Sequence, residues 1–309
     1  MGLPINKTTG NPGRDQIMEK YKPIIPDFEA FQRECQKEPI STVRRNDIKA
    51  REDFEEKLAE DFEFEQASWN DKVYRLKDEK KPGKSMLHWR GEYYVQEESA
   101  AIPVTVLDPK PGDEVLDMCS APGGKTTQVA DRINNKGLVL ANEVSNQRMK
   151  SLHANIYRTG SFSVNALNRD GRRIPEDREF DKVLVDAPCS GEGNNCRREE
   201  EEMASEQESK DLANLQLDLL EKAFALVKKG GTVVYSTCTF SPYENEFVVS
   251  QALENNNGVE LERIEPDFNH ERGLKNYRET SFGESLRKTV RIYPHHLQSG
   301  GMYVANFRC

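Results

Sequence analysis

"VLDMCSAPGGKTTQVA", residues 115–130, has the pattern of an apolar strand, a turn of small residues and the start of a helix. A phosphate-binding loop would require G-x-x-x-x-G-K-[ST] at this place. Gly124 and the two residues after it match the G-K-[ST] end of this pattern, but Cys119 occupies the position of its first glycine. This mismatch disfavours a nucleotide-dependent phosphotransferase. The remaining interpretation is a nucleoside-type cofactor that lies across Gly123 and Gly124, beside the backbone N–H groups at the helix start.

Apolar strands alternate with amphipathic helices from about residue 97 onward. This alternation predicts an α/β fold with a doubly wound, Rossmann-like and mostly parallel sheet. Because ligands bind at the carboxyl ends of strands in such sheets, residues that follow the strands should share one rim. The predicted strands are 113–119, 137–143, 161–167, 180–188 and 231–238, and the chain closes with strand, loop and strand over 290–308. The predicted helices are 124–133, 146–160, 211–230 and 244–256.

A different pattern precedes this region. Short stretches with helical apolar spacing (27–35, 50–62) are mixed with stretches that alternate like strands (72–78, 91–97). We therefore expect a small N-terminal α+β domain before the large sheet. The predicted division is a polar tail at 1–20, the small domain at 21–95 and the large domain at 96–309.

Composition excludes several classes of protein. No stretch has the roughly 18 to 20 apolar residues of a membrane span, and the first residues lack the apolar segment of a secretory signal. The six cysteines are scattered without a CxxC pair, which argues against a structural zinc site and a disulfide framework. We expect a cytoplasmic protein without a metal. The net charge of −9 does not suggest a nucleic-acid binder, but 80–84, 169–173 and the pair Arg197-Arg198 are locally basic.

An acidic residue follows each of the next two predicted strands, at positions suited to bind a nucleoside. Glu143 ends the second strand 19 positions after Gly124, where ribose hydroxyl groups are commonly held. Asp170 follows the third strand and is suited to the amino group of an adenine. A dinucleotide would usually require G-x-G-x-x-G, which is missing from the loop. S-adenosylmethionine uses the same two anchors without a diphosphate cradle, so it is the predicted cofactor.

Two cysteines, Cys189 and Cys238, each follow an apolar strand in a turn of small residues. Beside a methyl donor, a thiolate that adds to C6 of a pyrimidine makes C5 nucleophilic, which divides one difficult step into easier ones. The addition needs N3 protonated or hydrogen-bonded, and Asp186 is the candidate carboxyl group. The thiolate needs an electropositive environment, to which Lys125 would contribute. The residue pattern alone does not choose between the two cysteines.

Three long motifs resemble a known family. "DMCSAPGGKTTQVA", "DAPCSGEG" and "YSTCTFSPYENE", in this order, are similar to the RsmB/RsmF and NSUN family of RNA cytosine-5 methyltransferases. The resemblance covers residues 90–309 strongly and 40–90 weakly. It implies a Rossmann-like methyltransferase fold, Cys238 as the nucleophile and Cys189 as the residue needed for product release. It also implies that cofactor contacts come from Cys119, Ser120, Ala121, Pro122, Gly123, Gly124, Lys125, Glu143, Arg148, Asp170 and Asp186.

The resulting hypothesis is a monomeric enzyme that methylates C5 of a cytosine in tRNA or rRNA, with residues 21–95 helping to hold the RNA. The alternative is a catalytically silent RNA-binding or ribosome-assembly factor with the same fold. Such a factor would lack one of the four catalytic candidates, and all four are present: Lys125, Asp186, Cys189 and Cys238. One departure from the family pattern is the spacing after "SGEG", where three residues, 194–196, precede the basic pair instead of two.

Overall fold

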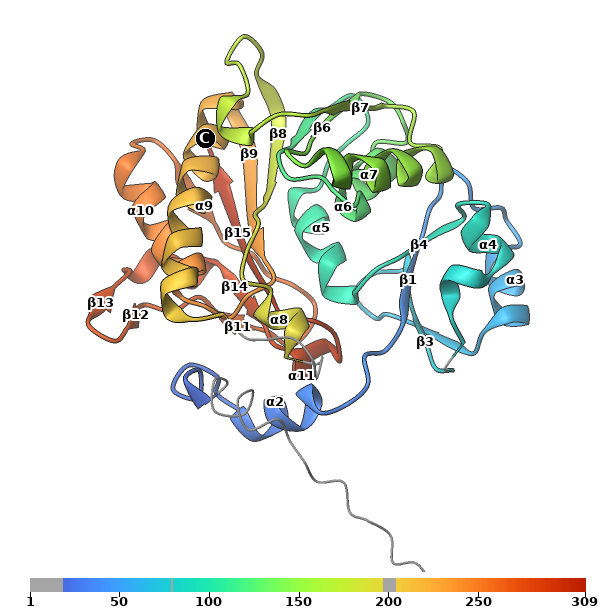
Figure 1. Ribbon diagram of the computed structural model, residues 1–309, viewed down its shortest axis with the longest axis horizontal. Coiled ribbons are helices and arrows are strands. Elements are labelled where there is room, and N and C mark those ends of the chain that lie inside the picture. The colour runs from blue at the N-terminus through green and yellow to red at the C-terminus, as the bar shows by residue number, and fades with distance from the viewer. Residues whose placement is uncertain (1–18, 79, 197–203) are drawn as a thin grey trace, which may run out of the picture.

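The computed structural model contains a large and a small β-sheet joined side by side, and a two-stranded sheet of β12 (Asn276–Tyr277) and β13 (Thr280–Ser281) (Figure 1). It describes residues 19–78, 80–196 and 204–309. The polar tail predicted at 1–20, apart from its last two residues, and the Arg197-Arg198 pair lie outside the described residues.

The large sheet has five adjacent parallel strands at one end and antiparallel strands at the other. Its strand order is β11-β14-β15-β9-β8-β5-β6-β7, and β10 pairs with the other end of β15. The strand order reverses between β5 and β8. The connections that follow these two strands therefore run to opposite sides and leave a crevice at the carboxyl end of β5. The parallel strands are β5 (Glu114–Asp117), β6 (Leu138–Asn142), β7 (Val164–Leu167), β8 (Phe180–Asp186) and β9 (Val227–Thr237). The antiparallel ones are β10 (Glu260–Glu262), β11 (Glu271–Arg272), β14 (Val290–Ile292) and β15 (Met302–Arg308).

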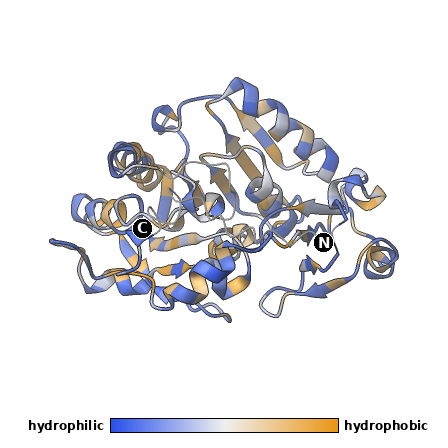
Figure 2. Cartoon of the chain, turned by 60° about the horizontal axis from the view of Figure 1, so that its bottom comes forward, coloured by the Kyte–Doolittle hydropathy of each residue, from blue (hydrophilic) through white to orange (hydrophobic). Residues whose placement is uncertain are grey.

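Helices cover both faces of this sheet, which confirms the doubly wound fold. One layer contains α5 (Ile102–Leu107), α6 (Gly124–Arg132) and α7 (Asn146–Thr159), and the other contains α9 (Glu206–Leu226) and α10 (Val248–Asn255). Figure 2 shows hydrophobic positions gathered on the strands between the two layers. Buried Val183 and Val233 pack towards α9, whereas Leu184 and Val234 pack towards α5, because successive strand residues point to opposite faces.

The small sheet has the order β2-β3-β1-β4 and is antiparallel. Its strands are β1 (Thr42–Arg45), β2 (Phe64–Gln66), β3 (Val73–Leu76) and β4 (Tyr93–Val95). Helix α3 (Phe54–Asp61) covers it with Phe54 and Leu58, which lie one turn apart and are both fully buried. Arg44 on β1 joins the two sheets, since its guanidinium donates to the Gly124 carbonyl at 2.8 Å and to Thr127 Oγ1 at 3.1 Å.

Helix α2 (Phe28–Cys35) does not pack with the small sheet, although the sequence analysis groups it there. It lies against α11 (Pro294–Leu297), at the lower edge of the large sheet in Figure 1. Phe28 and Phe31 share a buried cluster with Phe240 and Tyr293. The amphipathic pattern correctly identifies a helix here, but it carries no information about which distant apolar surface the helix covers.

The boundaries of α9 and β9 differ from the prediction for local reasons. The helix predicted over 211–230 begins at Glu206, because Ser205 and Glu208 form a reciprocal capping box. It ends at Leu226, and Val227 already begins β9. The strands β10 to β13 between residues 260 and 281 have no counterpart in the sequence analysis, because each is only two or three residues long.

Within the described ranges, none of the helices is long and apolar enough to cross a membrane.

Candidate active site

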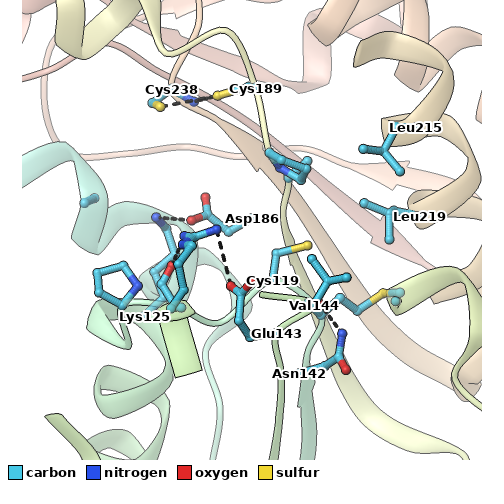
Figure 3. A pocket seen from close by; sticks show the side chains of 18 of the residues that line it. Cys119, Lys125, Asn142, Glu143, Val144, Asp186, Cys189, Leu215, Leu219 and Cys238 are labelled. Atoms are coloured by element: carbon cyan, nitrogen blue, oxygen red, sulfur yellow. Dashed lines mark hydrogen bonds and ion pairs between the residues drawn. The ribbon is translucent and has the colours of Figure 1, made fainter. Parts of the chain in front are cut away.

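A pocket of about 630 Å³ opens at the carboxyl ends of the five parallel strands. Every strand end contributes to its lining, as expected for a reversal of strand order at the centre of the sheet. Figure 3 shows the two cysteines at one end of the pocket, Glu143 and Asn142 at the other, and the Asp186–Lys125 pair between them. Leu215 and Leu219 of α9 form an apolar wall.

Glu143 is the carboxylate at the deep end. It follows β6 directly and is 2% exposed. The Ser145 backbone N–H donates to its Oε1 at 2.8 Å, and Arg148 lies 3.3 Å from its Oε2. Neighbouring Asn142 donates from its amide N–H₂ to the carbonyls of Met118 and Arg169, while its buried Oδ1 has no donor among the described residues. This end therefore offers a fixed carboxylate and a fixed acceptor to a bound molecule.

Asp170 forms the rim after β7. Arg172 pairs with it at 2.8 Å and its backbone N–H donates to Asp170 Oδ1 at 3.1 Å, which lowers the pKa of this carboxyl. The carboxyl group is consequently ionised and turned towards a fixed cation. Both residues line the pocket.

The loop between β5 and α6 meets the pocket with only some of its predicted residues. Lining side chains come from Cys119, Ala121, Pro122, Lys125, Glu143, Arg148, Asp170 and Asp186. Ser120 and Gly124 instead line an adjoining hollow beside Tyr94. Gly123 lines neither space. It has a φ of +109° at the N-cap of α6, and a Cβ there would lie 3.2 Å from Leu152, so this glycine serves the turn and close packing.

Lys125 and Asp186 form an ion pair in the middle of the pocket. Lys125 Nζ donates to Asp186 Oδ2 at 2.7 Å, and Ser236 Oγ donates to Oδ1 at 2.8 Å. Burial lowers the pKa of Lys125, but the charge and hydrogen bond of Asp186 outweigh it, so the pKa of Lys125 is raised. Lys125 thus stays a cation within the pocket.

The sulfur atoms of Cys189 and Cys238 lie 3.3 Å apart, although the residues are separated by 49 positions. The Cys238 backbone N–H also points at Cys189 Sγ, at 3.4 Å. A hydrogen bond from Cys189 lowers the pKa of the Cys238 thiol, and the Lys125 charge lowers it further, against burial and Asp186. The same contact, followed by burial, raises the pKa of Cys189 well above its ordinary value. The contact therefore makes Cys238 the more acidic thiol of the pair and Cys189 the less acidic one.

Glu244 braces the Cys189 turn and was not found by the sequence analysis. It is buried in the π-helical turn Tyr243–Phe247 and accepts hydrogen bonds from the backbone and hydroxyl of Ser190, at 3.0 and 2.6 Å. Gln216 of α9 donates to the same carboxylate at 2.9 Å and to the Pro188 carbonyl. Burial raises the pKa of Glu244 against these donors.

Glu192 links the two cysteine turns to the N-terminal segment. Its buried carboxylate accepts from Thr239, next to Cys238, at 3.1 Å. It also accepts from Tyr21 at 2.5 Å and pairs with Lys20 at 2.9 Å. The partners of Glu192 are 47 to 172 residues away in the sequence. Apart from the motif that contains Glu192, no local sequence pattern indicates these contacts.

The remaining cysteines, Cys35, Cys196 and Cys309, lie away from the pocket lining. Cys196 is fully buried beside Phe240. All six cysteines are among the described residues and form no disulfide. The described part of the chain contains no group of three metal-ligating side chains.

Comparison with known proteins gives two matches to family models. The model described as 16S rRNA methyltransferase RsmB/F matches residues 104–308, and that of the N-terminal domain of 16S rRNA methyltransferase RsmF matches 15–98. The chain is 36% identical over 312 residues to a ribosomal RNA small subunit methyltransferase F from Vibrio campbellii, covering 95% of this chain and 63% of that protein.

Other relatives agree. A human 28S rRNA (cytosine(4447)-C(5))-methyltransferase is 39% identical over 226 residues, which cover 71% of this chain and 27% of that protein. A solved methyltransferase homologue from Pyrococcus horikoshii superposes with a TM-score of 0.79 at 31% identity, covering 95% of this chain and 98% of the other. The chain thus spans about a quarter to two thirds of the length of these two curated relatives.

Proposed function

The chain belongs to the RsmB/F family of rRNA methyltransferases, and on this premise we propose that it methylates C5 of a cytosine in RNA with S-adenosylmethionine as donor. The observation that carries the proposal is the pair of cysteine sulfurs 3.3 Å apart, at the end of a pocket that also holds Lys125 and Asp186. The names of the relatives favour ribosomal RNA over tRNA as the substrate.

The deep end of the pocket fits the nucleoside half of S-adenosylmethionine. Glu143 offers a fixed carboxylate to ribose hydroxyl groups, and Asp170 offers one to an adenine amino group. Asn142 Oδ1, a buried acceptor without a protein donor, is a further contact for an N–H or O–H of the ligand. Bound there, S-adenosylmethionine supplies an electrophilic methyl group that leaves its bonding electrons on sulfur.

Cys238 is the proposed nucleophile because a hydrogen bond from Cys189 and the charge of Lys125 lower the pKa of its thiol. Its sulfur forms a bond to C6 of the cytosine, and the electrons of the C5=C6 bond move towards N3. N3 then takes a proton, which makes C5 an enamine carbon able to attack the methyl group. Attack by an uncharged thiol would be much slower, so the lowered pKa of Cys238 serves this step directly.

Lys125 and Asp186 are the proposed proton source for N3. N3 of cytosine is a hydrogen-bond acceptor, so an ionised carboxylate alone cannot assist it. Lys125 remains an ammonium group 2.7 Å from Asp186, and the pair can pass a proton from nitrogen through the carboxylate to N3. Ser236 holds the second oxygen of Asp186 and fixes its orientation.

Cys189 is proposed to assist product release. After methyl transfer a base removes the C5 proton, the C5=C6 bond re-forms and the Cys238 sulfur departs with the bonding electrons. The proton on N3 returns to the Asp186–Lys125 pair. The Cys189 thiol, 3.3 Å away, donates a hydrogen bond to the departing thiolate. Without this donor the covalent adduct should break down slowly, although it should still form.

Methylation can be tested by bisulfite sequencing of total RNA from cells with and without the gene. A cytosine that is protected only when the chain is present, and becomes unprotected with Cys238→Ala, identifies the substrate and the position together. If no RNA cytosine changes, while the purified chain still binds rRNA, the catalytically silent RNA-binding factor becomes the better hypothesis.

A further inference from the structure

Large apolar side chains are exposed at few places in the described structure, and two of them face one hollow. Trp89 of α4 (Met86–Trp89) is 73% exposed, and Tyr157 of α7 is 76% exposed. They line a shallow hollow of about 480 Å³ where the small sheet meets the large one. Two exposed rings that line one hollow are unusual for a surface without a ligand.

The hollow is also basic, in a chain whose net charge is −9. Lys49, Arg90 and Arg158 line it with the rings, against a single carboxylate, Glu92. Glu92 is 1% exposed and pairs with Arg90 at 3.1 Å, so it points inward rather than into the hollow. Arg158 donates to the carbonyls of His88 and Tyr93, so the accessible surface of the hollow combines the rings with the charges of Lys49 and the half-exposed Arg90.

The two helices that carry the rings, α4 and α7, are joined at their ends although they belong to different parts of the fold. Asn46 donates to the Gly91 carbonyl at 2.7 Å and to the Thr159 carbonyl at 2.8 Å, which ties the residue after α4 to the end of α7. Gly91 has a φ of +77°, and a Cβ there would lie 1.9 Å from the Arg158 carbonyl oxygen. The close approach at this joint requires glycine and makes the surface rigid.

We propose that this hollow, the Trp89–Tyr157 face, binds a single-stranded segment of the RNA substrate by stacking bases on the two rings. The inference rests on the proposed RNA methylation and adds a second contact outside the catalytic pocket. Base stacking on aromatic rings beside Lys and Arg is the usual mode of binding single strands without sequence preference. A protein partner would more commonly meet an apolar patch with balanced charge.

The face has a physical connection to the catalytic pocket. Arg148, at the start of α7, lines that pocket, and Tyr157 lies nine residues further along the same helix. At 1.5 Å per residue the two positions are about 14 Å apart along the helix axis. Nine residues are also about 2.5 helical turns, so the two side chains lie on opposite sides of α7, and an RNA that contacts both places must pass around the helix.

The test measures binding of a fluorescein-labelled oligoadenylate to the full chain by anisotropy at fixed ionic strength. This probe contains no cytosine, so the reading does not depend on methyl transfer. Trp89→Ala and Tyr157→Ala should each weaken binding about tenfold, whereas Trp89→Phe, which keeps a ring, should bind nearly as the natural chain. Lys49→Gln should reduce the salt dependence of binding, and Lys275→Gln, at an exposed lysine beside β12 on the far side of the molecule from α4 and α7 (Figure 1), should not.

Unchanged affinity in the Trp89→Ala, Tyr157→Ala double variant overturns the proposal and leaves the face to a protein partner. Equal losses in Trp89→Ala and Trp89→Phe also overturn it, because stacking would then not be the cause. S-adenosylmethionine binding by calorimetry should be the same in all variants, which shows that they are folded. A chain that binds oligoadenylate at this face but methylates no RNA contradicts the proposed function and not the face.

Discussion

Replacing Cys189 tests how the pocket would keep the proposed nucleophile, Cys238, reactive. The Cys189 thiol lies 3.3 Å from Cys238 Sγ and lowers the pKa of Cys238 by hydrogen bonding to the thiolate. Cys189→Ala removes this donor and leaves Lys125 as the remaining stabilising charge. The fraction of Cys238 present as thiolate should therefore fall at any pH below its pKa.

The size of the effect follows from the contact. A hydrogen bond to a charged group contributes about 1.5–3 kcal/mol, and a thiol is a weak donor, so about 1.4 kcal/mol is a fair value here. This energy corresponds to about a tenfold loss of thiolate. Cys189→Ser keeps a hydroxyl donor at the same place and should retain most of the thiolate.

The assay is alkylation of the folded protein with iodoacetamide, followed by mass spectrometry of the peptide that contains Cys238. At constant pH the Cys189→Ala rate should be about tenfold lower than the natural rate. Cys309→Ala, at a cysteine outside the pocket, is the matched control and should not change the rate. An equal or faster rate in Cys189→Ala than in Cys189→Ser would refute the donor role of Cys189.

Three further changes probe the cofactor end, the buried acid and the scaffold. Glu143→Gln should weaken S-adenosylmethionine binding about 10- to 100-fold in calorimetry, whereas Glu114→Gln, at the opposite end of β5, should leave it unchanged; equal affinities would remove Glu143 from the cofactor site. Burial raises the pKa of Asp117 to about 6, so the folded state binds the proton more tightly than the unfolded state, and stability should fall as pH rises from about 4 to 6. The free energy of unfolding in urea should fall by about 3 kcal/mol over this pH range, and Asp117→Asn should abolish this fall. The same dependence of stability on pH in the natural chain and in Asp117→Asn would contradict the raised pKa. Arg291→Met should lower the free energy of unfolding in urea by about 3–5 kcal/mol, because it leaves the fully buried carboxylate of Glu246 without its partner charge. Arg308→Met, at the exposed pair with Glu262, should lower it far less, and equal losses would argue against the importance of the buried pair.

The central strands and the strand-end residues could be predicted because their signals are local. The strand followed by small residues at 115–124 contains its own turn chemistry, and Asp186 and Cys238 follow apolar runs directly. In a parallel sheet such positions converge on one edge whatever the loops do. The sequence therefore identified side chains that the structure gathers around one pocket.

The residues that hold the pocket-lining turns in place could not be predicted in the same way, because their partners are distant in the sequence. Glu244 reaches Ser190 across 54 residues, and Glu192 reaches Tyr21 across 171. A buried carboxylate in a helical stretch has no periodic signature that distinguishes it from a solvated one. The association of α2 with the catalytic half has the same cause, since its apolar face would suit either sheet.

The central claim, that Cys238 attacks and Cys189 serves release, is tested most directly by trapping the RNA. Each variant is incubated with S-adenosylmethionine and the RNA identified by bisulfite sequencing, and then separated on a denaturing gel. Cys189→Ala should accumulate a denaturant-stable protein–RNA adduct, whereas Cys238→Ala and the double variant should form none. An adduct that survives Cys238→Ala but disappears with Cys189→Ala would contradict the assignment.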